Sequence, residues 1–386
     1  MKKDTQLAHL GRDVAYDPLT VNVPMHRAST VLFKSMAEQA EIQKRFDADE
    51  QIPTYGIFNM PQALALENAV AEIEGGFRAA TYPSGLAAVA GAILSCVKTG
   101  DHLLMPDSCY GPARRFCNSH LKRMGIETTY YAPVIGADIA NLMQPNTTVV
   151  YTESPGSHTF EIQDIPAIAK VARAKGARVI MDNAWATGYF FNAFEHGVDL
   201  VVQPATKYYA AHSDVLIGLI IANEAAWPQL KKTTYDLGQR ASPDDCFLTL
   251  RGMRTMGVRL KQHQESTLHI AKWLQTRPEV KRVLYPALES DPGHAIWKRD
   301  FTGATGLLGV ELHSASDEQV AAMMDHYDYF SLGYSWGGFE SLAVMAYLAR
   351  TVNPWKGGPL VRYNIGLEDA DDLIRDLEAG FERLKA

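Results

Sequence analysis

The sequence lacks several features that mark particular classes of protein. No apolar segment of its 386 residues reaches membrane-spanning length, and residues 1–6 have no apolar run of the kind found in a signal peptide. The four cysteines form no CxxC pair, so free thiols in a reducing cytoplasm are expected. The twelve histidines are scattered without the spacing of metal ligands, and we therefore expect no metal site.

The sequence also lacks a large excess of positive or negative charge. The chain has 37 Lys and Arg against 44 Asp and Glu, a net charge of −7, with no long basic run. This balance argues against nucleic acid or an anionic membrane as a partner. Two short basic pairs, Arg114-Arg115 and Lys122-Arg123, are expected at exposed helix positions.

The chain is longer than one typical hydrophobic core requires, so two lobes are expected. Residues 1–57 resemble an arm with little core of its own. Residues 58–245 alternate helices with short apolar strands, the βαβ rhythm of a mostly parallel sheet with helices on both faces. Residues 246–386 form the predicted second, smaller α/β domain.

Individual elements can be predicted from apolar periodicity and from turn residues. The expected helices cover residues 37–46, 166–175, 247–273 and 371–384. The expected strands cover residues 102–105, 148–151, 179–181, 198–202, 306–312 and 360–366.

An acid and an amine follow two of these strands. Asp182 comes directly after the strand at 179–181, and Lys207 stands just beyond the strand at 198–202. Ligands of open α/β sheets bind outside the carboxyl ends of the strands. The pair suits pyridoxal phosphate (PLP), whose aldehyde forms a Schiff base with Lys and whose ring nitrogen takes an acidic partner. Asp182 could instead form a turn or cap a helix, and Lys207 could be a solvated charge.

A possible anion site lies earlier in the chain. Ser84 and Gly85 precede an Ala-rich helical run, so Ser84 can cap the helix and Gly85 allows close approach of a ligand. Free N–H groups and the positive end of the dipole make such a helix start suitable for phosphate. An ordinary capped helix is the alternative.

The segment around the lysine resembles a known family. Ala205-Thr206-Lys207-Tyr208, followed by His212-Ser213-Asp214, is similar to the Lys signature of the Cys/Met-metabolism family of PLP-dependent enzymes. The likeness extends from Tyr55-Gly56 through residues 72–76 to residues 365–369. It implies the aspartate aminotransferase fold (fold type I), PLP as cofactor, and a cytoplasmic homotetramer whose active sites are shared between subunits.

The resemblance also implies roles for particular residues. In PLP binding it implicates Lys207, Asp182, Thr206, Tyr55, the backbone of Gly85 and Leu86, and Tyr110, whose ring would stack on the pyridine. In substrate binding it implicates Arg362 for the α-carboxylate, together with Ser335, Trp336, Tyr235 and Tyr55. By residue type alone, Tyr110 could be a packing residue, Arg362 a structural one, and Trp336 a core residue beside a Gly-rich turn.

Trp336, in Ser335-Trp336-Gly337-Gly338, resembles the β-lyase branch of the family. The implied reaction is β-elimination on L-cystathionine and related cysteine S-conjugates, with homocysteine, pyruvate and ammonia as the products from cystathionine and with Lys207 as the base at Cα. Lys207 or Tyr110 would then protonate the leaving thiolate. Alternatives are an amino-acid racemase or a broad cysteine-S-conjugate lyase. A γ-lyase, a γ-synthase and a non-catalytic PLP-binding regulator are less favoured.

One position departs from the family pattern. The family's arm usually reads Tyr-Gly-Arg, with the Arg reaching across the dimer to the phosphate, whereas this chain reads Tyr55-Gly56-Ile57. Tyr55 remains. We therefore expect PLP to be held chiefly by Lys207, the Gly85 helix start and Thr206.

Overall fold

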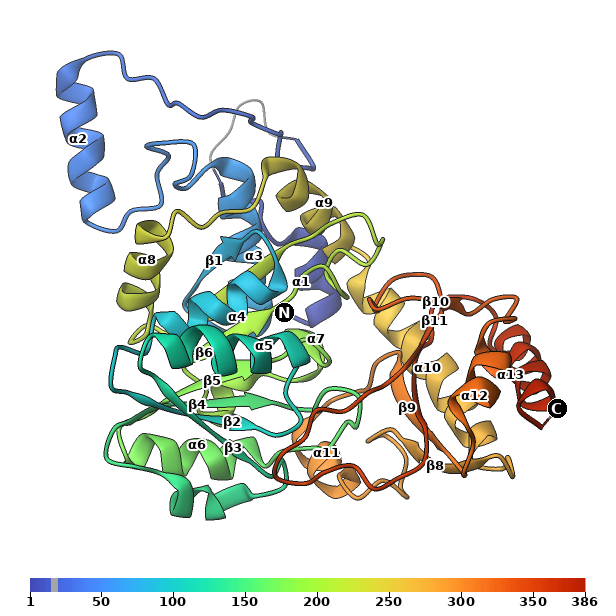
Figure 1. Cartoon of the computed structure of the whole chain (residues 1–386). Helices are drawn as coiled ribbons and strands as arrows, with labels where there is room; N and C mark the ends of the chain where they lie inside the picture. The colour runs from blue at the N-terminus through green and yellow to red at the C-terminus, as the bar shows by residue number, and fades with distance from the viewer. Residues whose placement is uncertain (15–19, 386) are drawn as a thin grey trace.

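The computed structural model describes residues 1–14 and 20–385 and is built around two β-sheets (Figure 1). The larger sheet has seven strands in the order β1-β7-β6-β5-β4-β2-β3. These strands are β1 (Arg78–Tyr82), β2 (His102–Pro106), β3 (Glu127–Tyr131), β4 (Thr147–Glu153), β5 (Arg178–Asp182), β6 (Leu200–Gln203) and β7 (Gly218–Ala222).

Most neighbours in the larger sheet are parallel. The pairs β2/β3, β2/β4, β4/β5 and β5/β6 run in the same direction, and β7 runs antiparallel to both β1 and β6. All residues of β2 and β6 are buried, as expected for strands covered on both faces. The predicted mostly parallel sheet is thus confirmed, with β7 as its antiparallel member.

Helices cover both faces of this sheet. On one face lie α4 (Gly85–Leu94), α5 (Gly111–Phe116) and α8 (Trp227–Asp236), and on the other lie α3 (Pro61–Glu74) and α6 (Ile165–Ala174). Shorter helical turns are η1 (Cys117–Leu121), η2 (Gly136–Leu142), α7 (Thr187–Phe190) and η3 (Ala193–His196). None of the helices in the described ranges is both long and apolar enough to span a bilayer.

The smaller sheet has five strands in the order β10-β11-β12-β9-β8, and only β10/β11 is a parallel pair. Its strands are β8 (Val280–Leu284), β9 (Leu307–Leu312), β10 (Ser331–Leu332), β11 (Leu342–Met345) and β12 (Leu360–Asn364). The helices of this lobe are α10 (Met256–Leu274), α11 (His294–Asp300), α12 (Asp317–Met324) and α13 (Ala370–Lys385).

The two lobes share a hydrophobic core. The apolar cluster under the α3 and α6 face, with Val179 and Val201, is continuous with the cluster of the second lobe, which includes Leu308 and Phe381. The opposite face of the large sheet has a separate cluster that includes Ile180 and Val202. Alternate residues of β5 and β6 therefore face different cores, and one of these cores joins the lobes.

The two helices of the amino-terminal region differ in how they contact the rest of the molecule. Helix α1 (Lys3–His9) packs beside α3 and α10 and buries Leu7. Helix α2 (Met36–Asp47) buries no residue and stands away from the body of the molecule (Figure 1). The assignment of residues 1–57 as an arm stays a prediction, with α1 packed on the body and α2 apart from it.

The predicted single helix over residues 247–273 is wrong. The chain forms α9 (Pro243–Met253) and then α10, with a break at Arg254 and Thr255. At Gly252 a Cβ atom would lie 2.5 Å from the carbonyl oxygens of Tyr209 and Ala210. Arg259 Nη2 donates to the Gly252 carbonyl at 2.7 Å, and that carbonyl would otherwise accept from residue 256 in a continuous helix.

The expected exposure of Arg114 is also wrong. Its side chain is buried and donates to Asp107 at 2.6 Å, whereas Arg115 is exposed as expected. The Asp107 carboxylate also accepts the backbone N–H groups of residues 351, 352 and 353, at 2.8–3.1 Å. Asp107 follows β2 of the large sheet, so these hydrogen bonds hold a loop of the second lobe against the first lobe.

We predict that Asp107→Ala lowers the free energy of unfolding by about 3–5 kcal/mol, because it leaves the buried charge of Arg114 without its carboxylate partner. Burial alone would raise the pKa of Asp107, but the backbone N–H groups and Arg114 outweigh burial and lower this pKa to about 2. Its stabilising effect should thus be complete above the unfolded pKa of about 4 and be lost as pH falls toward 2. Urea denaturation at several pH values measures both effects.

The matched control is Asp236→Ala, which removes an exposed carboxylate paired with Lys232. It should change the free energy of unfolding by less than about 1 kcal/mol. Equal losses in the two variants would contradict the role given to Asp107.

Candidate active site

Lys207 lies where the two lobes meet. It follows β6 after a short turn, and its Nζ donates to Ser335 Oγ at 2.9 Å. Nζ is also 5.1 Å from the centre of the Trp336 ring. Burial and the positive charge of Arg362 lower the pKa of Lys207 to about 8, against the opposing effect of Asp182. About a tenth of this amine is therefore neutral at pH 7, far more than for an ordinary lysine.

Asp182 is the last residue of the adjacent strand β5 and is buried. Its Oδ1 accepts the N–H of Ala184 at 3.0 Å, and its Oδ2 accepts the hydroxyl of Tyr151 at 3.4 Å. Burial raises the pKa of Asp182 to about 6. One oxygen thus makes the turn that the sequence suggested, while the side chain also supplies a negative charge that acts on Lys207.

A second buried carboxyl, Glu153, was missed in the sequence. It ends β4 and is paired in register with Asp182 of β5. Its Oε2 accepts the N–H of Tyr110 at 2.7 Å. Burial and the neighbouring Asp182 raise the pKa of Glu153 well above its usual value, which favours its protonated form. Its position at the end of a largely apolar strand is a signal like the one that identified Asp182.

Tyr110 lies in the loop between β2 and α5, at the same edge of the sheet. Its side chain is 43% exposed, so it is not simply a core residue. Burial and the charges of Asp182 and Glu153 raise the pKa of its phenol. The ends of β2, β4, β5 and β6 thus bring an aromatic ring, two carboxyls and an amine to one place.

The start of α4 lies against the turn that leads to Lys207. Ser84 caps this helix by accepting the N–H of Ala87 at 3.1 Å. A Cβ at Gly85 would come within 2.6 Å of Pro204, so this position requires glycine for its close approach. The first N–H groups of α4, including those of Gly85 and Leu86, could hold a phosphate beside Lys207.

The hydroxyl of Thr206 is engaged within the chain. It accepts the N–H of Ile217 at 2.9 Å and donates to the carbonyl of Ile217 at 3.2 Å. Its proton therefore has a partner already, and donation to a phosphate requires this second hydrogen bond to be exchanged.

Arg362 comes from β12 of the second lobe and is buried. Its Nη2 donates to the carbonyls of Gly333 at 3.1 Å and Ser335 at 3.0 Å. Its Nε is buried and has no hydrogen-bond partner within the described ranges. The guanidinium thus has a structural role in holding residues 333–335 and retains a donor for a ligand.

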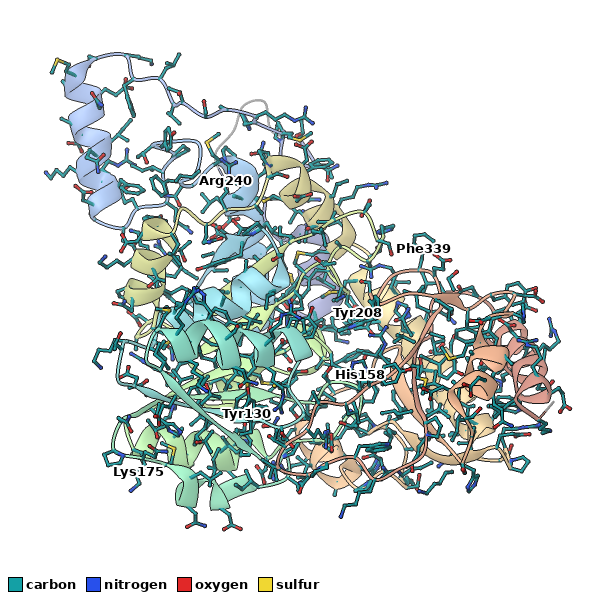
Figure 2. The ribbon with its side chains drawn as sticks, viewed as in Figure 1. Tyr130, His158, Lys175, Tyr208, Arg240 and Phe339 are labelled. Atoms are coloured by element: carbon teal, nitrogen blue, oxygen red, sulfur yellow. The ribbon has the colours of Figure 1, made fainter. Side chains whose placement is uncertain are left out.

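The loop that carries Ser335 and Trp336 fits closely over the lysine. Gly337 has φ +81°, and a Cβ there would lie 3.2 Å from the carbonyl carbon of Lys207. The N–H of Gly337 donates to Asn364 Oδ1 at 2.9 Å. Trp336 also packs on Tyr208, with ring centres 5.5 Å apart. Figure 2 shows Tyr208 between the two lobes.

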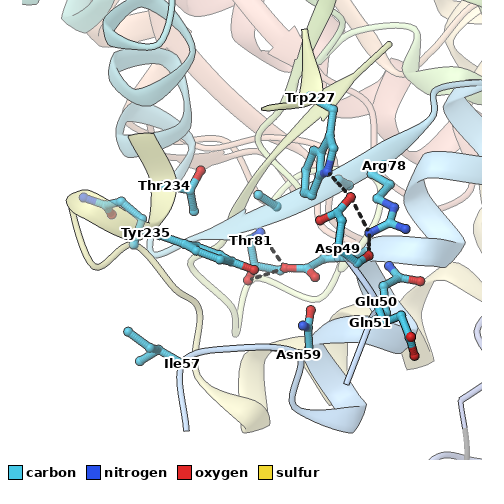
Figure 3. Close-up of a pocket in the computed structure, with 14 residues that line it drawn as sticks. Asp49, Glu50, Gln51, Ile57, Asn59, Arg78, Thr81, Trp227, Thr234 and Tyr235 are labelled. Carbon is cyan, nitrogen blue, oxygen red and sulfur yellow. Dashed lines mark hydrogen bonds and ion pairs between the residues drawn. The ribbon is translucent and has the colours of Figure 1, made fainter. Parts of the chain in front are cut away.

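Within one chain, Tyr55 and Tyr235 lie apart from the residues around Lys207. Tyr235 packs on Phe58 and Phe46, with ring centres 4.3 and 6.0 Å apart, and Tyr55 lies beside Phe58. Figure 3 shows Tyr235 and Ile57 at a cavity between the arm, β1 and α8. Neither Lys207 nor Arg362 lines this cavity.

We predict that Glu153→Gln leaves the affinity for PLP within about threefold of wild type, because the raised pKa of Glu153 favours a neutral carboxyl and the amide retains an acceptor for Tyr110. Glu153→Ala should weaken PLP binding by about tenfold, since it leaves the N–H of Tyr110 without its partner. Fluorescence titration of the apoprotein with PLP measures both. Equal losses in the two variants would show that a charge at Glu153 is required.

Proteins of similar sequence and structure cover the whole chain. The family model of the Cys/Met metabolism PLP-dependent enzymes matches residues 4–382. The chain is 45% identical to a cystathionine β-lyase of Haemophilus influenzae, over 98% of both chains. It is 39% identical to an L-alanine/L-glutamate racemase of Wolbachia pipientis, over 100% of this chain and 98% of that protein.

A solved structure extends this similarity to the fold. The crystal structure of metB from Corynebacterium glutamicum has a TM-score of 0.91 and 27% identity, over 100% of this chain and 98% of the other. Family and fold agree with the predicted fold type I and with PLP as cofactor. The chain belongs to the Cys/Met-metabolism family of PLP-dependent enzymes.

Proposed function

We propose that this protein is a PLP-dependent carbon–sulfur β-lyase that cleaves L-cystathionine and related cysteine S-conjugates. With cystathionine and water the products are homocysteine, pyruvate and ammonia, which places the enzyme in transsulfuration toward methionine. The observation that carries the proposal is the meeting of Lys207, Asp182 and Arg362 at one site, in a chain 45% identical to a cystathionine β-lyase.

The residues of the site fit PLP by their chemistry. Lys207 offers an amine of lowered pKa, Asp182 offers a buried carboxylate, and the start of α4 offers free N–H groups for the phosphate. Tyr110 lies near Asp182 and offers a ring to stack on the pyridine. When bound, PLP supplies an electron-withdrawing ring that stabilises negative charge at the substrate's Cα.

Some residues of the chain bind the substrate, and others transfer protons. Arg362 binds the α-carboxylate and so fixes the orientation of the bonds at Cα. Lys207 Nζ, once neutral, accepts the Cα proton as general base. Asp182 holds a proton on the ring nitrogen, and Lys207 or Tyr110 donates a proton to the leaving sulfur. Ser335 and Trp336 border the substrate.

A racemase is the second candidate, because one relative at 39% identity is an L-alanine/L-glutamate racemase. Racemisation and β-elimination both begin with removal of the Cα proton, so the same residues serve either reaction. Trp336 beside the Gly337-Gly338 pair favours β-elimination over the γ-lyase and γ-synthase reactions.

We further propose that the enzyme is a cytoplasmic homotetramer whose sites are completed by a neighbouring subunit. Helix α2 buries no residue, and Tyr55 is 50% exposed beside Phe58. A second copy of the chain would cover these groups and bring Tyr55 and Tyr235 to a site. The four cysteines are free thiols, which supports a reducing compartment.

The function is tested by incubating the PLP-loaded protein with L-cystathionine and assaying pyruvate, and with L-alanine while following its chirality. Pyruvate formation is the expected result. Racemised alanine without pyruvate would identify a racemase, and neither product would indicate a non-catalytic PLP-binding protein. Lys207→Ala should lose the visible absorbance of bound PLP and lower turnover by about 10⁴-fold or more, since it removes the base.

Lys175→Ala is the matched control, because Lys175 is exposed at the end of α6, far from the second lobe (Figure 2). This variant should keep both the absorbance and the turnover. Turnover retained in Lys207→Ala would contradict the assignment of the base.

The lowered pKa of Lys207 gives a separate prediction for the apoprotein. The neutral amine is the reactive form, and with a pKa of about 8 its fraction rises about tenfold between pH 7 and 9. Stopped-flow absorbance should show the rate of PLP capture rising about tenfold over this range and levelling off above pH 9. An ordinary lysine would give a rise of about a hundredfold without a plateau.

A further inference from the structure

His158 has an unusual backbone conformation in the segment that follows β4. Its φ is +63°, in the left-handed region that few residues other than glycine adopt. Such conformations persist only where the surrounding structure fixes them, and they are frequent at functional sites. Figure 2 places His158 in the region where the two lobes meet.

The surroundings of His158 connect it to Arg362. The carbonyl oxygen of His158 lies 2.9 Å from the position that a Cβ on Gly309 would take, and Gly309 of β9 is paired in register with Arg362 of β12. Burial, and then the positive charge of Arg362, lower the pKa of His158 to about 4. The imidazole is therefore neutral at pH 7 and is exposed to the field of the guanidinium.

Each of these two side chains has a buried nitrogen without a partner. His158 Nδ1 and Arg362 Nε are both buried, and neither has a hydrogen bond within the described part of the chain. Most buried polar atoms in proteins are paired, so two such atoms in neighbouring side chains require an explanation. A carboxylate has acceptor sites for both, and a neutral imidazole can donate to it without adding a second positive charge beside Arg362.

We propose that His158 binds the α-carboxylate of the substrate together with Arg362, and so determines specificity for amino acids over simple amines. In the tautomer with hydrogen on Nδ1, the imidazole donates one hydrogen bond to the carboxylate, and Arg362 donates the charge-assisted ones. The proposal rests on the proposed function in one respect, namely that the substrate is an α-amino acid.

Two variants separate the side chain from the backbone. His158→Gly removes the donor and is compatible with φ +63°. His158→Asn keeps a donor near the position of Nδ1 and also tolerates the left-handed conformation. The control is His102→Asn, because the buried ring of His102 has partners on both nitrogens, Thr147 at 2.8 Å and Thr129 at 2.9 Å, at the start of β2.

The measurement is a spectral titration of the PLP-loaded variants with L-alanine and with ethylamine, which is L-alanine without its carboxylate. His158→Gly should weaken L-alanine binding by about ten- to a hundredfold, the range expected for a lost hydrogen bond to a charged group, and leave ethylamine binding unchanged. His158→Asn and His102→Asn should bind L-alanine within about threefold of wild type. With L-cystathionine, His158→Gly should raise KM and leave kcat within about threefold.

Equal weakening for L-alanine and ethylamine, or no weakening in His158→Gly, would overturn the proposal. The titration does not depend on carbon–sulfur cleavage. If the wild-type protein fails to release pyruvate from cystathionine while His158→Gly still selectively loses L-alanine, the lyase function is refuted and the role of His158 stands.

Discussion

The chemistry of the site depends on several ionisable side chains that lie close together and shift one another's pKa. Asp182, Glu153 and Arg362 are buried and Lys207 is partly buried, and burial disfavours the charged form of each. The register of β4 and β5 places two carboxyls side by side, and the charge of Asp182 raises the pKa of Glu153. The raised pKa of Glu153 favours its neutral form, and the charge of Asp182 acts on the amine of Lys207.

This arrangement requires both lobes, since the acids and the amine come from the large sheet and the guanidinium comes from the small one. Arg362 holds residues 333–335, and this loop in turn contacts Lys207 through Ser335 and Gly337. Farther out, Asp107 and the ion pair of Arg350 with Glu161 fasten the same lobe to the first. The shared core under the large sheet completes this connection. The lobes are therefore better described as two parts of one site than as independent units.

The sequence alone predicts the part of the site that lies at the edge of the large sheet. Asp182 and Lys207 are identified because each follows an apolar strand, and the carboxyl ends of parallel strands lie at one edge. Arg362, in a strand of the other sheet, and Ser335, in a loop of the same lobe, lie more than a hundred residues from Lys207 along the chain. Only the resemblance to a family connected them with it. Glu153 carried a signal like that of Asp182, but an acid at the end of a strand is common, and its register with Asp182 cannot be predicted from local pattern.

The errors have a common physical cause, which is tertiary contact overriding local pattern. The apolar periodicity of residues 247–273 continues through the break between α9 and α10, since the break results from Arg259 and from the close approach of Tyr209 to Gly252. That same arginine has a consequence for the reactive amine. Its Nη1 donates to the carbonyl of Tyr208 at 3.0 Å, one residue beyond Lys207, while its backbone belongs to the first long helix of the second lobe. Arg259 therefore ties the position of that helix to the main chain beside Lys207, so the orientation of the amine depends on a residue that does not contact it.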